Sequence, residues 1–189
     1  MRPDASPGPD ASPAPAAATG LLARLAGAYT GACVVLSRLA LGVAVLGLLL
    51  LILAVQYQVV GRYVFNDTPT WAEALSMLLV LYVTAFAVAV GVRDGGHIGF
   101  ESLVNLLPAR GRQAMELLAH ALVALFGALM VHSGWMWTTL KWDQRKPMLG
   151  VPEGMDFLPL VIAGALIVLF SIEHIVARLR GTPVEPAWN

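Results

Sequence analysis

Residues 39–55 read LALGVAVLGLLLLILAV, an apolar run without a single polar side chain. The apolar character extends back to Cys33 and forward to Val60 with few polar interruptions. An α-helix of about 20 mostly apolar residues crosses the hydrocarbon core of a bilayer. The sequence therefore predicts a long, tilted transmembrane helix over about residues 33–60, which decides the class of the fold.

Three further apolar runs follow, at residues 74–92, 117–137 and 157–172. With their flanks they predict spans over about residues 71–92, 114–138 and 156–177. Only 13% of the chain is charged and its mean hydropathy is +0.72, whereas soluble domains carry about 25% charged residues. The sequence thus predicts an all-α integral membrane protein with four transmembrane helices, and its net charge of zero gives no sign of nucleic-acid binding.

The membrane domain is expected to occupy residues 21–180. Residues 1–20 are rich in Pro and Ala and predict a disordered tail, and residues 181–189 form a C-terminal tail. Two stretches predict short helices in the membrane interface, because their apolar residues recur at helical spacing. The first contains Leu21, Leu22, Leu25 and Tyr29, and the second contains Phe100, Leu103, Val104 and Leu107.

The distribution of Lys and Arg predicts the orientation of the spans. Eight of these residues lie in the N-terminal segment, the second loop and the C-terminal segment, against four in the first and third loops. Loops that remain in the cytoplasm carry the excess of positive charge, so both termini are predicted to be cytoplasmic. An aromatic belt at the outer interface would then comprise Trp71, Trp135, Trp137 and Trp142.

The four apolar runs contain no Asp, Glu, Lys or Arg. A protein that moves ions across a bilayer usually places such groups at mid-depth, so an independent small channel or exporter is disfavoured. The helices are expected to pack through small residues four positions apart. These pairs are Ala85 and Ala89, Ala87 and Gly91, and Ala124 and Ala128.

Two histidines leave an alternative open. His120 and His174 are predicted to lie near the cytoplasmic ends of neighbouring spans, where they could ligate a b-type haem in the membrane anchor of a redox enzyme. The simpler interpretation is that they are interfacial histidines bonded to water, backbone, Glu116 or Glu173. The sequence has no phosphate-binding loop, nucleophile elbow or metal-ligand cluster, and GVRDGG at residues 91–96 is interpreted as a turn.

The connection between the first two spans reads QYQVVGRYVFNDTPTWAE, residues 56–73. Arg62, Tyr63 and Trp71 are interface anchors by residue type. The residues Asn66, Asp67, Thr68 and Pro69 predict a turn. Thr70 is predicted to be the N-cap of the second span, with Glu73 as its capping-box partner.

Several short motifs together resemble one family. RYVFN and PTWAE precede the second span, VRDGGHI and FESL follow it, and PMLGVP precedes the fourth. In this order and spacing they are similar to the small permease subunit, DctQ type, of tripartite ATP-independent periplasmic (TRAP) transporters. The matching positions are Arg62, Tyr63, Phe65, Asn66, Trp71, Glu73, His97, Ile98, Glu101, the stretch from Pro147 to Pro152, Leu158, Pro159 and Gly164.

The resemblance implies a subunit of the bacterial inner membrane that is not an enzyme and holds no cofactor. It would scaffold a large permease subunit, which contains the substrate and sodium sites. A periplasmic binding protein would deliver a carboxylate-bearing solute to the pair. The candidate interface or structural residues are Arg62, Tyr63, Asn66, Trp71, Glu73, His97, Glu101 and Pro152, and the remaining surface would contact membrane lipid.

Overall fold

The computed structural model describes residues 16–67, 69–94 and 109–180, and these form long helices joined by short segments. The helices are α1 (Ala16–Val64), α2 (Thr70–Asp94), α4 (Ala109–Leu140) and α5 (Leu158–Arg180), with a short 3₁₀ helix η1 (Glu153–Asp156) before α5. Four segments are long and apolar enough to cross a membrane: Ala26–Val64, Thr70–Asp94, Gly111–Leu140 and Glu153–Arg178. The prediction of four helices long and apolar enough to cross a membrane is confirmed, and each predicted range lies inside one of these segments.

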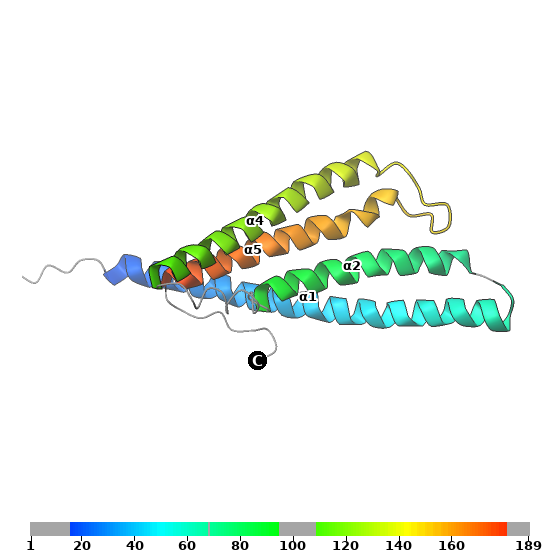
Figure 1. Ribbon diagram of the computed structural model, residues 1–189, viewed down its shortest axis with the longest axis horizontal. Helices are drawn as coiled ribbons and strands as arrows, with labels where there is room; N and C mark the ends of the chain where they lie inside the picture. Colours follow the sequence, from blue (N-terminus) through cyan, green and yellow to red (C-terminus); the bar gives the residue numbers. More distant parts are fainter. Residues whose placement is uncertain (1–15, 68, 95–108, 181–189) are drawn as a thin grey trace, which may run out of the picture.

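The helices form two antiparallel hairpins, α1 with α2 and α4 with α5, and α2 packs on α5 to join them (Figure 1). The hairpins lie together where α2 ends and α4 begins, and they diverge toward the opposite end (Figure 1). We call the first end the Arg93 end. The second is the hairpin end, where α1 connects to α2 and α4 connects to α5.

The first helix is longer than the sequence predicts. α1 runs without interruption from Ala16, inside the segment interpreted as a tail, and residues 21–29 form part of it. The predicted separate entry helix is therefore wrong, because the chain continues straight into the first span. The second predicted interfacial helix, with Phe100 and Leu103, lies outside the described residues, as do residues 1–15 and 181–189.

The buried core lies in the half of the bundle nearer the Arg93 end. Small side chains allow the helices to approach: Ala40 on α1, Ala89 on α2 and Ala163 on α5 are each at most 4% exposed. The rest of this core comprises Cys33, Val90, Leu166, Ile167 and Phe170. Ala85 and Ala89 face this core as predicted, whereas Ala87, Gly91 and Ala128 are exposed.

Glycines set the contact between α4 and α5. A Cβ added at Gly164 would lie 2.7 Å from the Gly127 carbonyl oxygen, and one added at Gly127 would lie 2.9 Å from the Gly164 carbonyl oxygen. These separations are shorter than van der Waals contact, so the two backbones touch where the helices cross. Association of helices in a bilayer depends on such close approach, since the lipid removes most of the hydrophobic driving force.

We predict that Gly164→Ala destabilises the protein by about 1–3 kcal/mol, because the added methyl group collides with the backbone of α4. Gly91→Ala is the matched control, since Gly91 is exposed and a Cβ there meets no atom within 4 Å. Thermal unfolding in detergent micelles would compare the variants with the wild type. Equal melting temperatures for Gly164→Ala and the wild type would contradict the close crossing.

Candidate functional site

The turn between α1 and α2 is tight at the hairpin end. The Asp67 amide donates to the Gly61 carbonyl oxygen at 3.1 Å, and Asn66 adopts a left-handed conformation with φ of 50°. Asn tolerates this region better than most residues, so the predicted role of Asn66 in a turn is confirmed. A Cβ at Gly61 would lie 3.0 Å from the Asp67 carbonyl oxygen, which explains the glycine.

The start of α2 differs from the predicted capping box. The Ala72 amide donates to the Pro69 carbonyl oxygen at 3.0 Å, and the helix begins at Thr70 itself. The Thr70 hydroxyl donates to Met148 Sδ at 3.2 Å, in the segment that connects α4 to α5. Thr70 therefore ties the first turn of α2 to the segment that connects α4 to α5, and because Thr70 already belongs to the helix, the interpretation of it as an N-cap is wrong. Glu73 does lie in the first turn of α2, where its charge suits the helix dipole.

The predicted residues of this segment lie on the surface and do not form one cluster. Tyr63 is 80% exposed and Trp71 is 45% exposed, and Arg62 and Glu73 are exposed as well. The Trp71 ring packs on Tyr57 with centroids 5.5 Å apart. Large exposed aromatic and basic side chains at a helix end are typical of residues at a membrane interface.

The connection between α4 and α5 folds back on itself at the same end. The Lys146 amide donates to the Val151 carbonyl oxygen at 2.9 Å, the Glu153 amide donates to the Gln144 carbonyl oxygen at 2.7 Å, and Arg145 pairs with Pro152 in an isolated bridge. The candidate residue Pro152 is thus half-buried within this folded connection. The Tyr82 hydroxyl on α2 donates to the Met155 carbonyl oxygen at 3.1 Å, which ties the connection to the other hairpin. His97 and Glu101 lie outside the described residues.

A buried ion pair joins the hairpins at the Arg93 end. Arg93 Nε on α2 lies 3.0 Å from Glu173 Oε2 on α5, and the two side chains are 0% and 1% exposed. Arg93 Nη1 also lies 3.1 Å from Asp94 Oδ1, and its guanidinium carbon is 5.9 Å from the centroid of the Phe170 ring. Paired, hydrogen-bonded charges are tolerated in such a dry site, whereas an isolated charge would be costly.

The other helices contribute to the same polar site. On α1, Cys33 lies beside Glu173 and Tyr29, and the Tyr29 hydroxyl donates to the Leu169 carbonyl oxygen at 2.7 Å. On α4, Glu116 forms ion pairs with Arg112 and with Arg178 of α5. The Arg93 end is therefore fastened by polar contacts that involve all four spans.

The two histidines also meet at the Arg93 end. The rings of His120 and His174 stack with centroids 4.7 Å apart and planes within 6° of each other. His174 Nε2 hydrogen-bonds the Arg93 carbonyl oxygen at 2.9 Å, as the simpler interpretation expected. Two axial haem ligands must instead point at an iron that lies between them, and rings stacked face to face leave no space for a porphyrin.

The buried site around Arg93 and Glu173 was not predicted from the sequence. The motif GVRDGG was interpreted as a turn, but Gly91 to Asp94 form the last turn of α2. Arg93 and Glu173 directly follow two of the apolar runs and do not belong to them. The two residues are also 80 positions apart along the chain, so the sequence gives no sign that they pair. The available signal was that Glu173 directly extends the fourth apolar run, at a depth where an unpaired carboxylate would be costly.

The comparison with known families decides what kind of membrane protein this is. The family described as the DctQ component of tripartite ATP-independent periplasmic transporters matches residues 51–181, more than half of the chain. The chain belongs to the DctQ family. It is a small permease subunit of the TRAP type, and the resemblance seen in the motifs is confirmed.

Individual relatives agree with this assignment. A Haemophilus influenzae protein named as a TRAP transporter small permease is 24% identical over 132 residues, which cover 70% of this chain and 82% of that protein. The C4-dicarboxylate TRAP transporter small permease DctQ of Vibrio cholerae is 32% identical over 105 residues, which cover 53% of this chain and 45% of that protein. The sialic acid TRAP transporter permease SiaT of H. influenzae is 32% identical over 77 residues, which cover 41% of this chain and 12% of SiaT.

We predict an order of stability among variants of the buried site in this DctQ-family chain. Arg93→Met should lower the free energy of unfolding by about 3–5 kcal/mol, because it leaves the carboxylates of both Glu173 and Asp94 without their cationic partner. Glu173→Gln should cost less, about 1–3 kcal/mol, because Arg93 keeps Asp94 as a partner. Thermal unfolding in lipid nanodiscs would measure both losses.

Arg112→Met is the matched control for the buried arginine, since the Arg112 side chain is 47% exposed in its pair with Glu116. Its loss should stay below about 1 kcal/mol, as for most exposed ion pairs. A cost for Arg93→Met no larger than that of Arg112→Met would show that the buried pair does not hold the hairpins together.

Proposed function

We propose that this protein is the non-catalytic scaffold subunit of a sodium-coupled TRAP transporter in the bacterial inner membrane. Its partner would be a large permease subunit that carries the substrate and sodium sites. The observation that carries this proposal is the match to SiaT, in which a segment similar to this chain makes up 12% of a much longer permease. In SiaT the similar segment and the rest of the permease form one polypeptide, so the two parts are expected to pack side by side.

The distribution of charged side chains along the spans favours the role of a scaffold subunit. The charged side chains of the described spans flank the four apolar runs, and the runs themselves carry none. Arg93 and Glu173 satisfy each other at one end, and Lys146 and Asp156 do so at the other. An ion or solute path needs polar groups at mid-depth, so the transport path belongs to the partner.

The exposed faces of α1 and α4 supply the contact area. Leu46 and Leu53 on α1 and Leu125 on α4 are each more than half exposed. A helix in a bilayer can present such residues to lipid or to another helix. Because α1 and α4 bury few of their residues within the chain, they extend the static surface against which a large subunit could rest.

The hairpin end is proposed to face the periplasm, with both termini in the cytoplasm, as the Lys and Arg distribution predicts. The turn with Arg62 and Trp71 and the folded connection with Pro152 would then lie where a periplasmic binding protein docks. The solute is proposed to bear a carboxylate, since relatives are named for C4-dicarboxylates and sialic acid.

Deletion of this gene should abolish uptake of the solute although the large subunit and the binding protein are still produced. A plasmid copy should restore uptake. Uptake of the labelled solute, measured with and without sodium, would show the loss in the deletion strain and its restoration by the plasmid. Undiminished uptake in the deletion strain, with both other components present in the cell, would refute the scaffold role.

Trp71→Ala should lower uptake several-fold, because Trp71 packs on Tyr57 beside the proposed docking turn. Trp135→Ala is the control, since Trp135 is also an exposed tryptophan, at 60% against 45% for Trp71, but lies on α4 and not in the turn between α1 and α2. Immunoblots of the membrane fraction would correct for expression. Equal uptake by the two variants would mean that Trp71 serves only as an interface anchor.

A further inference from the structure

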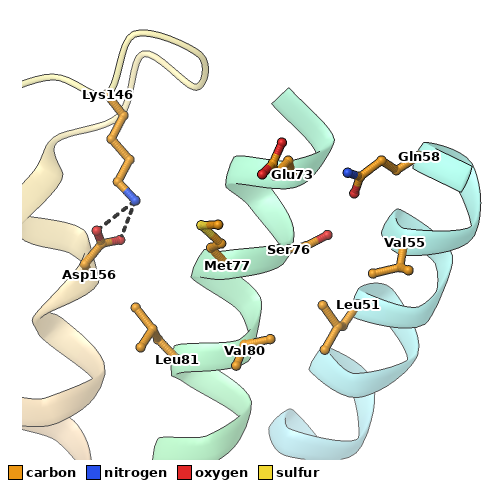
Figure 2. Close-up of a pocket in the computed structure, with 10 residues that line it drawn as sticks. All are labelled: Leu51, Val55, Gln58, Glu73, Ser76, Met77, Val80, Leu81, Lys146 and Asp156. Atoms are coloured by element: carbon orange, nitrogen blue, oxygen red, sulfur yellow. Dashed lines mark hydrogen bonds and ion pairs between the residues drawn. The ribbon is translucent and has the colours of Figure 1, made fainter. Parts of the chain in front are cut away.

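A groove of about 630 Å³ lies near the hairpin end (Figure 2). Residues of α2 form its floor, α1 forms one wall, and Lys146 and Asp156 form the other wall (Figure 2). The lining residues are Leu51, Val55, Gln58, Glu73, Ser76, Met77, Val80, Leu81, Lys146 and Asp156. Its volume is in the range of sites that bind small molecules, about 300–1,000 Å³.

The lining changes character along the helix axis. Gln58, Glu73 and Lys146 lie at the end nearest the connecting segments, whereas Leu51, Val80 and Leu81 lie deeper in the bundle (Figure 2). The polar part is close in sequence to Trp71 and Tyr57, whose packed rings mark the interface. The groove therefore begins at headgroup depth and continues into the hydrocarbon.

The polar part of the groove carries an uncompensated carboxylate. Lys146 Nζ lies 2.7 Å from Asp156 Oδ2, so these two charges satisfy each other. Glu73 is exposed and forms no ion pair with any residue that the structure describes. The groove thus offers a paired lysine on one side and an unpaired carboxylate on the other, which favours an occupant with an ammonium group and disfavours an anionic one.

The length of the groove separates two kinds of occupant. From Glu73 to Leu81 the floor runs eight residues of α2, which is about 12 Å along a helix. One leaflet contributes about half of the 30 Å hydrocarbon core, or about 15 Å, so the groove does not extend beyond a single leaflet. A transmembrane helix of a partner would instead run through the whole core, well past the end of the groove.

We propose that this groove is a binding site for one phosphatidylethanolamine molecule. The primary ammonium of the headgroup donates to the Glu73 carboxylate, which is the unpaired charge at the polar end of the groove. One acyl chain lies along Met77, Val80 and Leu81. Phosphatidylcholine cannot donate a hydrogen bond from its trimethylammonium group, and phosphatidylglycerol has no ammonium, so the site distinguishes among the three headgroups.

Native mass spectrometry of the full chain, extracted in mild detergent with any partner that it retains, tests this site. Dioleoyl phosphatidylethanolamine, phosphatidylcholine and phosphatidylglycerol are added separately, and the lipid-bound fraction is measured. Retention of the ethanolamine lipid should exceed that of the other two and should fall about tenfold in Glu73→Gln. Asp143→Asn is the matched control, since Asp143 is an exposed carboxylate on the same end outside the groove.

A second variant tests the acyl chain site. Val80→Trp fills the floor and should also reduce retention, whereas Leu129→Trp, on an exposed face of α4, should not. Equal binding of the three lipids, or unchanged retention in both Glu73→Gln and Val80→Trp, would overturn the proposal. A photocrosslinker at Met77 that captures a protein chain in native membranes, and no lipid, would assign the groove to a partner subunit. Since no readout depends on uptake, these results are independent of the transport role.

Discussion

The relative placement of the two helical hairpins depends on the buried contact between Arg93 and Glu173. Without it, α2 and α5 would be joined at this end by the hydrogen bond between His174 and the Arg93 carbonyl oxygen and by small and apolar side chains, which pack little better against each other than against lipid. The ion pair sets the register of the two helices, because its hydrogen bonds form in only one arrangement. Cys33 on α1 lies beside the same pair and extends this constraint to the first helix.

The shape of the bundle follows from the contact that holds the two hairpins together at the Arg93 end. Near Arg93 the helices are close enough to bury alanine and serine side chains completely, whereas toward the hairpin end the two hairpins diverge (Figure 1). The divergence creates the groove over α2 and leaves much of α1 and α4 to lipid or to a partner. A rigid base with broad apolar faces is the form expected of a subunit that supports another protein and moves nothing itself.

The four spans could be predicted from the sequence because each one is a continuous apolar run, and the bilayer sets its length. Partners across helices could not be predicted in this way, because nothing near Arg93 in the sequence indicates Glu173. The contact of Gly127 with Gly164 was missed for the same reason, since small residues are common in these helices and only the packing shows which ones touch. Glu73 was found from its motif, but its place in the groove depends on where the connection with Lys146 folds.

The most direct test of the account is a distance measurement between the two hairpins near the Arg93 end. Nitroxide labels at Leu39→Cys on α1 and Leu118→Cys on α4, in a Cys33→Ser background, would be examined by double electron–electron resonance in nanodiscs. The account predicts one narrow distance distribution, which becomes broad when Arg93→Met is added. A distribution that stays equally narrow after Arg93→Met would show that the hairpins are held together by something other than this ion pair.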